Sequence, residues 1–220
     1  MINFIKTRWI SIVAHAGALI SLAILIYDYF ADNLTVNPIQ EATIRTGKLA
    51  LIFLVLSLAC TPIITVLGFK PAQKVRRALG LYGFMFVAIH FAIFTLWDYA
   101  LDLPLIVQQV TEKPFILAGF GAFVLLIPLA ITSTKGWQKR LGKDWKTLHK
   151  LFFPIMVLAV LHFSLSVKSL LARPEPLQWA LVVALLLVVR LPAVRKWVSA
   201  KRQKLLAGMQ RSNVKPTPAQ

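Results

Sequence analysis

The run LHKLFFPIMVLAVLHFSLSVK, residues 148–168, places His149 and His162 in a segment that is otherwise apolar enough to cross a membrane. A second run, ALGLYGFMFVAIHFAIFTLW at residues 78–97, encloses His90 in the same way. An ionisable side chain at such a depth is costly and usually functional. A metal, a proton path or a hydrogen bond to a neighbouring helix could each explain such an imidazole. Because three of the four histidines lie on two segments, the pattern favours a metal cofactor.

The whole chain has the composition of an integral membrane protein. Of its 220 residues, 58% are hydrophobic and 15% are charged, and the mean hydropathy of +0.71 is far above that of soluble domains. We expect an all-α integral membrane fold, with a six-transmembrane-helix bundle in residues 1–192 and a basic cytoplasmic tail at 193–220. The six windows that are long and apolar enough to span a bilayer are roughly residues 9–29, 46–67, 78–97, 115–132, 148–167 and 177–193.

The formal charge of +17 is unevenly placed along the chain. Twenty of the 25 basic residues lie before the first window, between the second and third windows, at or near the link from the fourth to the fifth window, or at the C-terminal end of the chain. Asp144 is the one acid in these regions. The other links hold the remaining five basic residues and seven acids. This positive-inside pattern predicts that both termini are cytoplasmic. It also explains the basic charge by topology and attraction to membrane lipid, and not by nucleic acid.

Cys60 and His15 are the other candidates for chemistry inside the windows. Cys60 is the only cysteine, which excludes an internal disulfide, a thiolate metal cluster and c-type haem attachment. For His15 we expect a core histidine satisfied by a hydrogen bond. The sequence shows no Gly-rich nucleotide motif on a strand–helix turn and no evident internal repeat.

His90 and His162 are expected at similar depth, because the two windows that carry them run in the same direction. His90 lies eight residues before Asp98, and His162 lies six residues before Lys168. Two neutral imidazoles from facing helices are the axial ligands that the iron of a b-type haem requires. A zinc ion would need further ligands, and no Asp, Glu or Cys is available at that level.

A second level is indicated nearer the basic side. Arg76 precedes His90 by fourteen residues and His149 precedes His162 by thirteen, which is about 20 Å along a helix. Fourteen residues return to nearly the same helix face, whereas thirteen miss it by about 140°. His149 and His162 therefore share a face only if Pro154 or a non-helical first turn unwinds the segment.

Three stretches resemble a known family: RRALGLYGFMFVAIHF (76–91), TSTKGWQKRLGKDWKTLHKLFF (132–153) and LHFSLSVK (161–168). The layout resembles the ferric reductase-like transmembrane domain shared by NADPH oxidases and metalloreductases. More narrowly, the stretches resemble the MsrQ (YedZ) family, the haem-binding membrane subunits of bacterial protein-methionine-sulfoxide reductase systems.

The resemblance implies a b-type cytochrome of the bacterial inner membrane with haem b and FMN. It implies an electron-transfer subunit, with a quinol of the quinone pool as donor. The implied acceptor is the periplasmic molybdopterin-containing catalytic subunit, which reduces oxidised methionines.

The chain departs from the two-haem oxidases at Arg76, where those proteins have histidine. A guanidinium stays protonated and cannot ligate iron, so we expect Arg76 to bind haem propionates or a flavin phosphate. His149 is then expected to ligate a second haem or to contact flavin or quinone.

Two other functions are compatible with the sequence. One is an NAD(P)H-linked ferric reductase, which would need a separate cytoplasmic flavoprotein because the chain has only a short tail after the last window. The other is a membrane scaffold whose histidines make hydrogen bonds only. A visible spectrum would separate a cytochrome from a scaffold.

Overall fold

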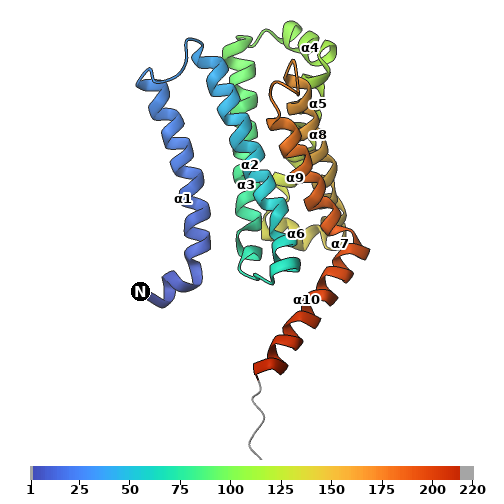
Figure 1. Ribbon diagram of the computed structural model, residues 1–220. Helices are drawn as coiled ribbons and strands as arrows, with labels where there is room; N and C mark the ends of the chain where they lie inside the picture. Colours follow the sequence, from blue (N-terminus) through green and yellow to red (C-terminus); the bar gives the residue numbers. More distant parts are fainter. Residues whose placement is uncertain (1, 214–220) are drawn as a thin grey trace, which may run out of the picture.

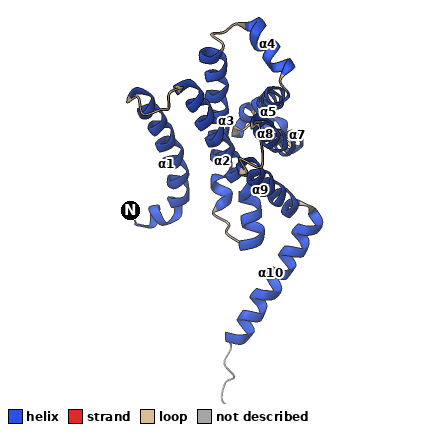
Figure 2. Ribbon diagram, turned by 45° about the horizontal axis from the view of Figure 1, so that its top comes forward, coloured by secondary structure: helices blue, strands red, loops and turns tan. Residues whose placement is uncertain are grey.

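The computed structural model describes residues 2–213, and every regular element in that range is helical (Figures 1 and 2). A π-helical turn, η1 (Phe94–Asp98), follows α3, and a 3₁₀ turn, η2 (His149–Leu151), precedes α8. The α-helices are α1 (Ile2–Phe30), α2 (Pro38–Leu67), α3 (Ala72–Ile93), α4 (Leu103–Glu112), α5 (Pro114–Ile131), α6 (Lys135–Leu141), α7 (Lys143–Leu148), α8 (Phe152–Ser166), α9 (Glu175–Arg190) and α10 (Pro192–Asn213).

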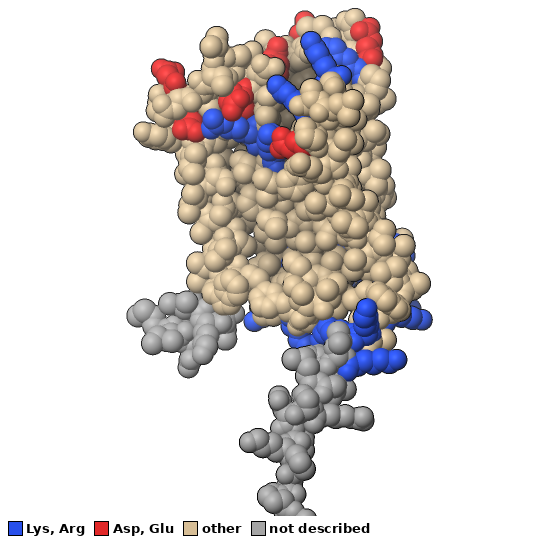
Figure 3. Space-filling model, viewed as in Figure 1, with Lys and Arg blue, Asp and Glu red and all other residues tan. Residues whose placement is uncertain are grey.

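Within residues 2–213, five helical segments are long and apolar enough to cross a membrane. The number rises to six if α9 and the start of α10, which meet at an angle of 77°, count as one broken span. The chain is therefore a multi-pass helical membrane protein with five or six spans. An uncharged band separates two charged ends on the face drawn in Figure 3.

The two ends of the bundle differ in charge. We call the end with the α2–α3 link, α6, α7 and α10 the basic end, because Lys and Arg dominate it (Figures 1 and 3). The opposite end, with the α1–α2 link, α4 and the α8–α9 link, mixes acids and bases and is called the mixed end. The start of α1 and all of α10 lie at the basic end (Figure 1).

Two antiparallel helix pairs, α2 with α3 and α5 with α8, form the centre of the bundle. Leu54, Leu58, Ile155 and Met156 are almost completely buried where the pairs meet. Gly83 permits the close approach of α2 and α3, because a Cβ there would lie 2.6 Å from the Leu54 side chain. The role of Gly83 is therefore to allow two helices to pack closely.

The second span starts earlier than its predicted window. Asn37 caps α2 by accepting a hydrogen bond from the Gln40 backbone at 3.0 Å, and Pro38 occupies the first turn. The helix therefore begins eight residues before the predicted window. It also continues through Pro62 to Leu67, since a membrane helix can tolerate the loss of the one backbone hydrogen bond that proline removes.

Two segments that were expected to be links are helical. Asp102 caps α4 by accepting a hydrogen bond from the Leu105 backbone at 3.0 Å, and Pro104 lies in the first turn. The tail after Pro192 continues as α10 up to Asn213, and residues 214–220 lie outside the described part of the chain.

Candidate functional site

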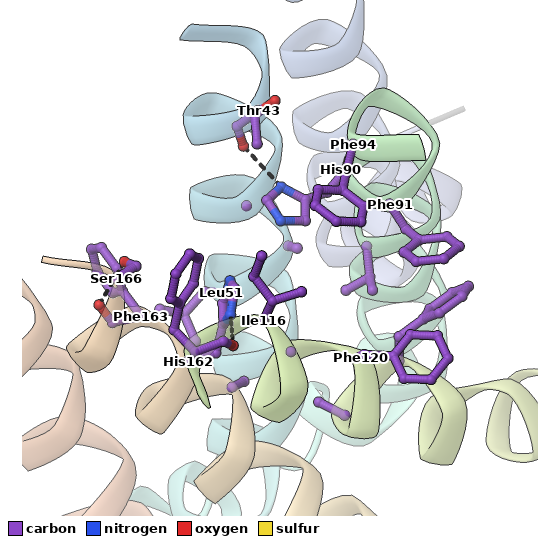
Figure 4. Close-up of a pocket in the computed structure, with 18 of the residues that line it drawn as sticks. Thr43, Leu51, His90, Phe91, Phe94, Ile116, Phe120, His162, Phe163 and Ser166 are labelled. Carbon is purple, nitrogen blue, oxygen red and sulfur yellow. Dashed lines mark hydrogen bonds between the residues drawn. The ribbon is translucent and has the colours of Figure 1, made fainter. Parts of the chain in front are cut away.

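His90 is held by a backbone carbonyl of the neighbouring helix. It lies on α3, and its Nδ1 donates a hydrogen bond of 2.9 Å to the Thr43 carbonyl oxygen on α2 (Figure 4). A carbonyl can only accept, so this contact fixes the proton on Nδ1. The other ring nitrogen, Nε2, then carries the lone pair that a metal needs.

His162 on α8 is held in the same manner by α5. Its Nδ1 donates a hydrogen bond of 2.6 Å to the Phe115 carbonyl oxygen (Figure 4). Nε2 of this ring is therefore also the nitrogen with a free lone pair. The structure brings His90 and His162 together from α3 and α8, with their ring centres 6.1 Å apart.

The spacing of the two rings fits one metal ion between them. An imidazole nitrogen binds a metal at about 2 Å, so two rings on one iron stand roughly 6 Å apart, centre to centre. The observed 6.1 Å matches this distance, and the ring planes are 85° apart. The described part of the chain contains no cluster of three or more metal-binding side chains, at this site or at any other.

A glycine lies against each of the two rings. A Cβ on Gly47 would lie 3.2 Å from the His90 ring, and a Cβ on Gly119 would lie 2.6 Å from Nδ1 of His162. Each glycine lies one helical turn after the residue whose carbonyl accepts the hydrogen bond. Gly47 follows Thr43 on α2, and Gly119 follows Phe115 on α5. Any side chain at these positions would push the imidazole away from its hydrogen bond.

Carbonyl, glycine and histidine therefore form a unit that occurs twice. The offset between the copies is the same 72 residues for each member, from 43 to 115, from 47 to 119 and from 90 to 162. The expectation that the chain has no internal repeat overlooked this unit. Few identical residues carry it, and one of its three members is a backbone atom.

A cavity of about 370 Å³ opens between the two histidines, within the usual size range of ligand pockets. Its walls are mainly apolar and include Phe91, Phe94, Phe120 and Phe163 (Figure 4). Such walls exclude water and suit the faces of a flat macrocycle. The donor set, the spacing and the walls all fit a haem with His90 and His162 as axial ligands.

His149 lies apart from this pair, at the basic end. Its ring stacks on Trp145 with centres 4.0 Å apart, and its Nδ1 donates to the Trp145 carbonyl at 3.0 Å. The Nε2 atom is buried and has no hydrogen-bond partner among the described residues. The segment begins with the 3₁₀ turn η2 and not with a non-helical turn, and α8 continues through Pro154. Three residues of 3₁₀ helix reduce the offset from the His162 face to about 80°, without removing it.

Arg76 lies within electrostatic range of the His149 side chain. Its backbone carbonyl accepts a hydrogen bond from the Ser57 hydroxyl at 2.9 Å. The structure thus brings Arg76 and His149 to one level at the basic end, but it places a single histidine there. No second imidazole faces His149 as His90 faces His162.

Arg190 is a further member of this level that sequence reasoning missed. It was counted only as a topology signal at the end of the last window. In the structure its Nη2 donates to the Leu58 carbonyl at 2.5 Å, its Nε is buried without a partner, and its charge interacts with that of Arg76. Arg190 lies within the last apolar window, residues 177–193, and not after it. A charged residue inside such a window is the signal that could have identified it.

His15 differs from the expected core histidine. It makes the expected hydrogen bond, at 2.7 Å to the Tyr82 hydroxyl on α3, but its side chain is exposed on the surface of the isolated chain. The reason is that α1 packs at the edge of the bundle, mainly against α3.

Comparison with known proteins agrees with this architecture. Residues 46–160 match the family described as ferric reductase like transmembrane component. The haem-binding subunit MsrQ of protein-methionine-sulfoxide reductase from Xanthomonas euvesicatoria pv. vesicatoria is 40% identical over 86% of this chain and 88% of its own length.

The chain belongs to the MsrQ family. The MsrQ subunit of Herminiimonas arsenicoxydans is a further relative, 39% identical over 80% of this chain and 81% of its own. No solved structure matches the chain.

Proposed function

We propose that the chain is a membrane b-type cytochrome of a methionine sulfoxide reductase system, with His90 and His162 as axial ligands. The paired imidazoles carry the proposal, because both rings are anchored through Nδ1, line the same cavity and have their centres 6.1 Å apart. Membership of the MsrQ family supports haem as the group that they hold.

The haem would supply one-electron chemistry, and the chain's own residues hold it and set its surroundings. The Thr43 and Phe115 carbonyls keep the proton on Nδ1 of each ring, which makes Nε2 the ligand and raises its basicity. The phenylalanine walls exclude water and keep the local dielectric low. These groups thereby tune the reduction potential.

The proposed topology has six crossings, with both termini on the cytoplasmic side of the bacterial inner membrane. It is supported by the excess of Lys and Arg at the basic end, where α1 starts and α10 lies (Figures 1 and 3). On this topology the His90–His162 pair lies toward the periplasm, and the Arg76 level lies toward the cytoplasm.

We place electron entry at the level of Arg76, His149 and Arg190. Arg76 and Arg190 lie within electrostatic range of each other there, and the one acid of the links at that end, Asp144, lies on the exposed surface. Such a pair favours an anion, and a guanidinium fork suits phosphate or carboxylate oxygens. We propose a flavin phosphate of FMN or the propionates of a second haem as that anion. The unpartnered Nε2 of His149 is available to a quinol, a flavin or an iron.

We place electron exit at the mixed end, where a periplasmic molybdopterin-containing catalytic subunit would dock. The links at that end, residues 31–45, 98–114 and 168–176, carry a net charge of −2. Docking there would favour a partner surface of positive charge.

A reduced-minus-oxidised visible spectrum of the purified protein tests the proposal. A b-type cytochrome gives a sharpened Soret band and a resolved alpha band on reduction. The control is the double variant His90→Ala/His162→Ala, purified in parallel. Absence of haem bands in the wild-type protein after expression with added haem precursor would remove the proposed function.

A further inference from the structure

The cavity between the histidines has a mainly apolar lining that includes two lysines. Lys48 follows Gly47, the residue against the His90 ring, and Lys113 precedes Phe115, whose carbonyl holds His162, by two residues. Lys113 lies just before the start of α5, at the mixed end, whereas Lys48 lies inside α2, next to Gly47 at the level of the His90 ring. Asp98 is the one acidic residue in the lining.

The two lysines differ in their present partners. Nζ of Lys48 lies 2.8 Å from a carboxylate oxygen of Glu175, with both side chains partly exposed. Within the described part of the chain, the ammonium group of Lys113 makes no hydrogen bond or ion pair, and its side chain is exposed. An unpaired cation thus stands at the opening of an apolar cavity.

A haem has two carboxylate side chains on one edge, and these are its only charged groups apart from the iron. In an apolar cavity they are costly unless they reach water or a cation. Arg76 cannot serve the haem of this cavity. It lies fourteen residues from His90, about 20 Å along the helix, which exceeds the reach of a propionate.

We propose that Lys113, with Lys48 as the second group, binds the propionates of the haem and turns its carboxylate edge toward the mixed end. This inference rests on the proposed haem site. Lys113 is the stronger contributor, because Lys48 must exchange or share its contact with Glu175. Asp98 opposes the propionates by charge, so it weakens binding of the natural haem.

The test compares haem b with haem b dimethyl ester, in which both carboxylates are neutral. Apoprotein from haem-deficient cells is placed in nanodiscs, and affinities are measured by titration of the Soret band. The variants are Lys113→Ala, Lys48→Ala and Asp98→Asn. The control is Lys168→Ala, which removes the same charge at the same end from a residue outside the cavity lining.

For haem b, Lys113→Ala should weaken binding roughly threefold to tenfold, as expected for the loss of a charge-assisted contact that is open to solvent. Lys48→Ala should weaken it less, Lys168→Ala should leave it unchanged, and Asp98→Asn should tighten it. For the diester, all four variants should match the wild-type protein, because no carboxylate is left to bind.

Retention of the low-spin spectrum in each variant shows that the histidine pair is intact and that the loss concerns the carboxylate edge. The inference is overturned if Lys113→Ala binds haem b as the Lys168→Ala control does. It is equally overturned if Lys113→Ala loses the same factor for haem and diester. Wild-type apoprotein that binds neither compound would instead remove the proposed function itself.

Discussion

The two levels of the bundle share the same pair of helix hairpins but build different sites. At the outer level, both hairpins supply the same unit of carbonyl, glycine and histidine. At the inner level the correspondence fails, because the offset of 72 residues relates His149 to Arg77 and Leu148 to Arg76. The outer level, which is nearer the mixed end, therefore holds two imidazoles, and the inner level, which is nearer the basic end, holds one imidazole and two guanidinium groups.

The difference indicates that the two levels suit different ligands. Symmetric, anchored ligands suit a haem whose geometry changes little as an electron passes. The inner level is asymmetric, and Nε2 of His149 and Nε of Arg190 have no hydrogen-bond partner there. Such a site suits a ligand with a phosphate or carboxylate group. On the proposed function, the inner level receives electrons from a donor and the outer level holds the haem.

The largest effect is expected from removal of a ligand at the outer level. His90→Ala and His162→Ala should each abolish the low-spin haem spectrum, since each removes one of two axial nitrogens. Membrane insertion should persist, because loop charges set the topology. Haem content and visible spectra of the purified variants measure the effect.

His15→Ala is the matched control for the ligand variants. It removes an imidazole that contacts only Tyr82, so the haem spectrum should be retained. A normal low-spin spectrum in His90→Ala or His162→Ala would rule out the proposed pair. Loss of haem in His15→Ala as complete as in His90→Ala would show that the wrong ligand was chosen.

The pair of outer histidines and most of the helices could be predicted from the sequence, since apolar runs and their charged flanks determine depth and direction. The anchors of the histidines could not, because Thr43 and Phe115 contribute backbone oxygens that any residue type would offer. Gly47 and Gly119 gave no distinct signal among ten glycines.

Two helix starts were missed although local signals were present. Asn37 before Pro38 and Asp102 before Pro104 are both a capping residue followed by a proline in the first turn, a pattern typical of helix N-termini. The hydropathy windows concealed them, because both starts lie outside the apolar runs. Arg190 was missed for the opposite reason, because an arginine at the basic end is already explained by topology.

The second prediction concerns Gly47 and Gly119, which differ in how closely they approach their histidine rings. Gly119→Ala should lower haem content and shift the midpoint potential more than Gly47→Ala does, because the added Cβ meets its imidazole at 2.6 Å and not 3.2 Å. Haem per protein and a redox titration measure both changes.

Gly121→Ala is the control for the glycine series. It lies on the same helix as Gly119, and its added Cβ would have nothing nearer than a Leu158 methyl group at 3.9 Å. It should keep full haem and gain roughly 1 kcal/mol of helix stability. If Gly119→Ala behaved like Gly121→Ala, the glycine would have no role in positioning His162.

The third prediction addresses the inner level. Arg76→Ala and His149→Ala should each slow reduction by the cytoplasmic-side donor roughly tenfold, the effect of losing one charge-assisted contact. The outer haem spectrum should remain intact, since both residues lie far from His90 and His162. Stopped-flow reduction with a quinol analogue in proteoliposomes measures the rate.

Arg77→Ala serves as the control for Arg76, because it removes the same charge from the next position, where the side chain is exposed. Its reduction rate should match that of the wild-type protein. If Arg76→Ala and His149→Ala were reduced at the wild-type rate with full cofactor content, electron entry would have to lie elsewhere.

The smallest effect is expected at the docking surface of the mixed end. Neutralising three acids by Asp32→Asn, Asp102→Asn and Glu112→Gln should slow partner reduction about threefold at low ionic strength. The difference should disappear at high salt. Asn at position 102 keeps an acceptor for the cap of α4, so the helix is preserved. Unchanged partner reduction at low salt would argue against this surface.

The central claim is that two imidazoles from α3 and α8 bind one iron. Electron paramagnetic resonance of the purified, oxidised protein tests it most directly, because the signal reports both the number of axial nitrogens and the angle between the ring planes. The ring planes are 85° apart, so the account predicts a low-spin ferric signal of the strongly anisotropic kind that near-perpendicular imidazoles give. A high-spin signal as the main species, which indicates at most one imidazole on the iron, would contradict it.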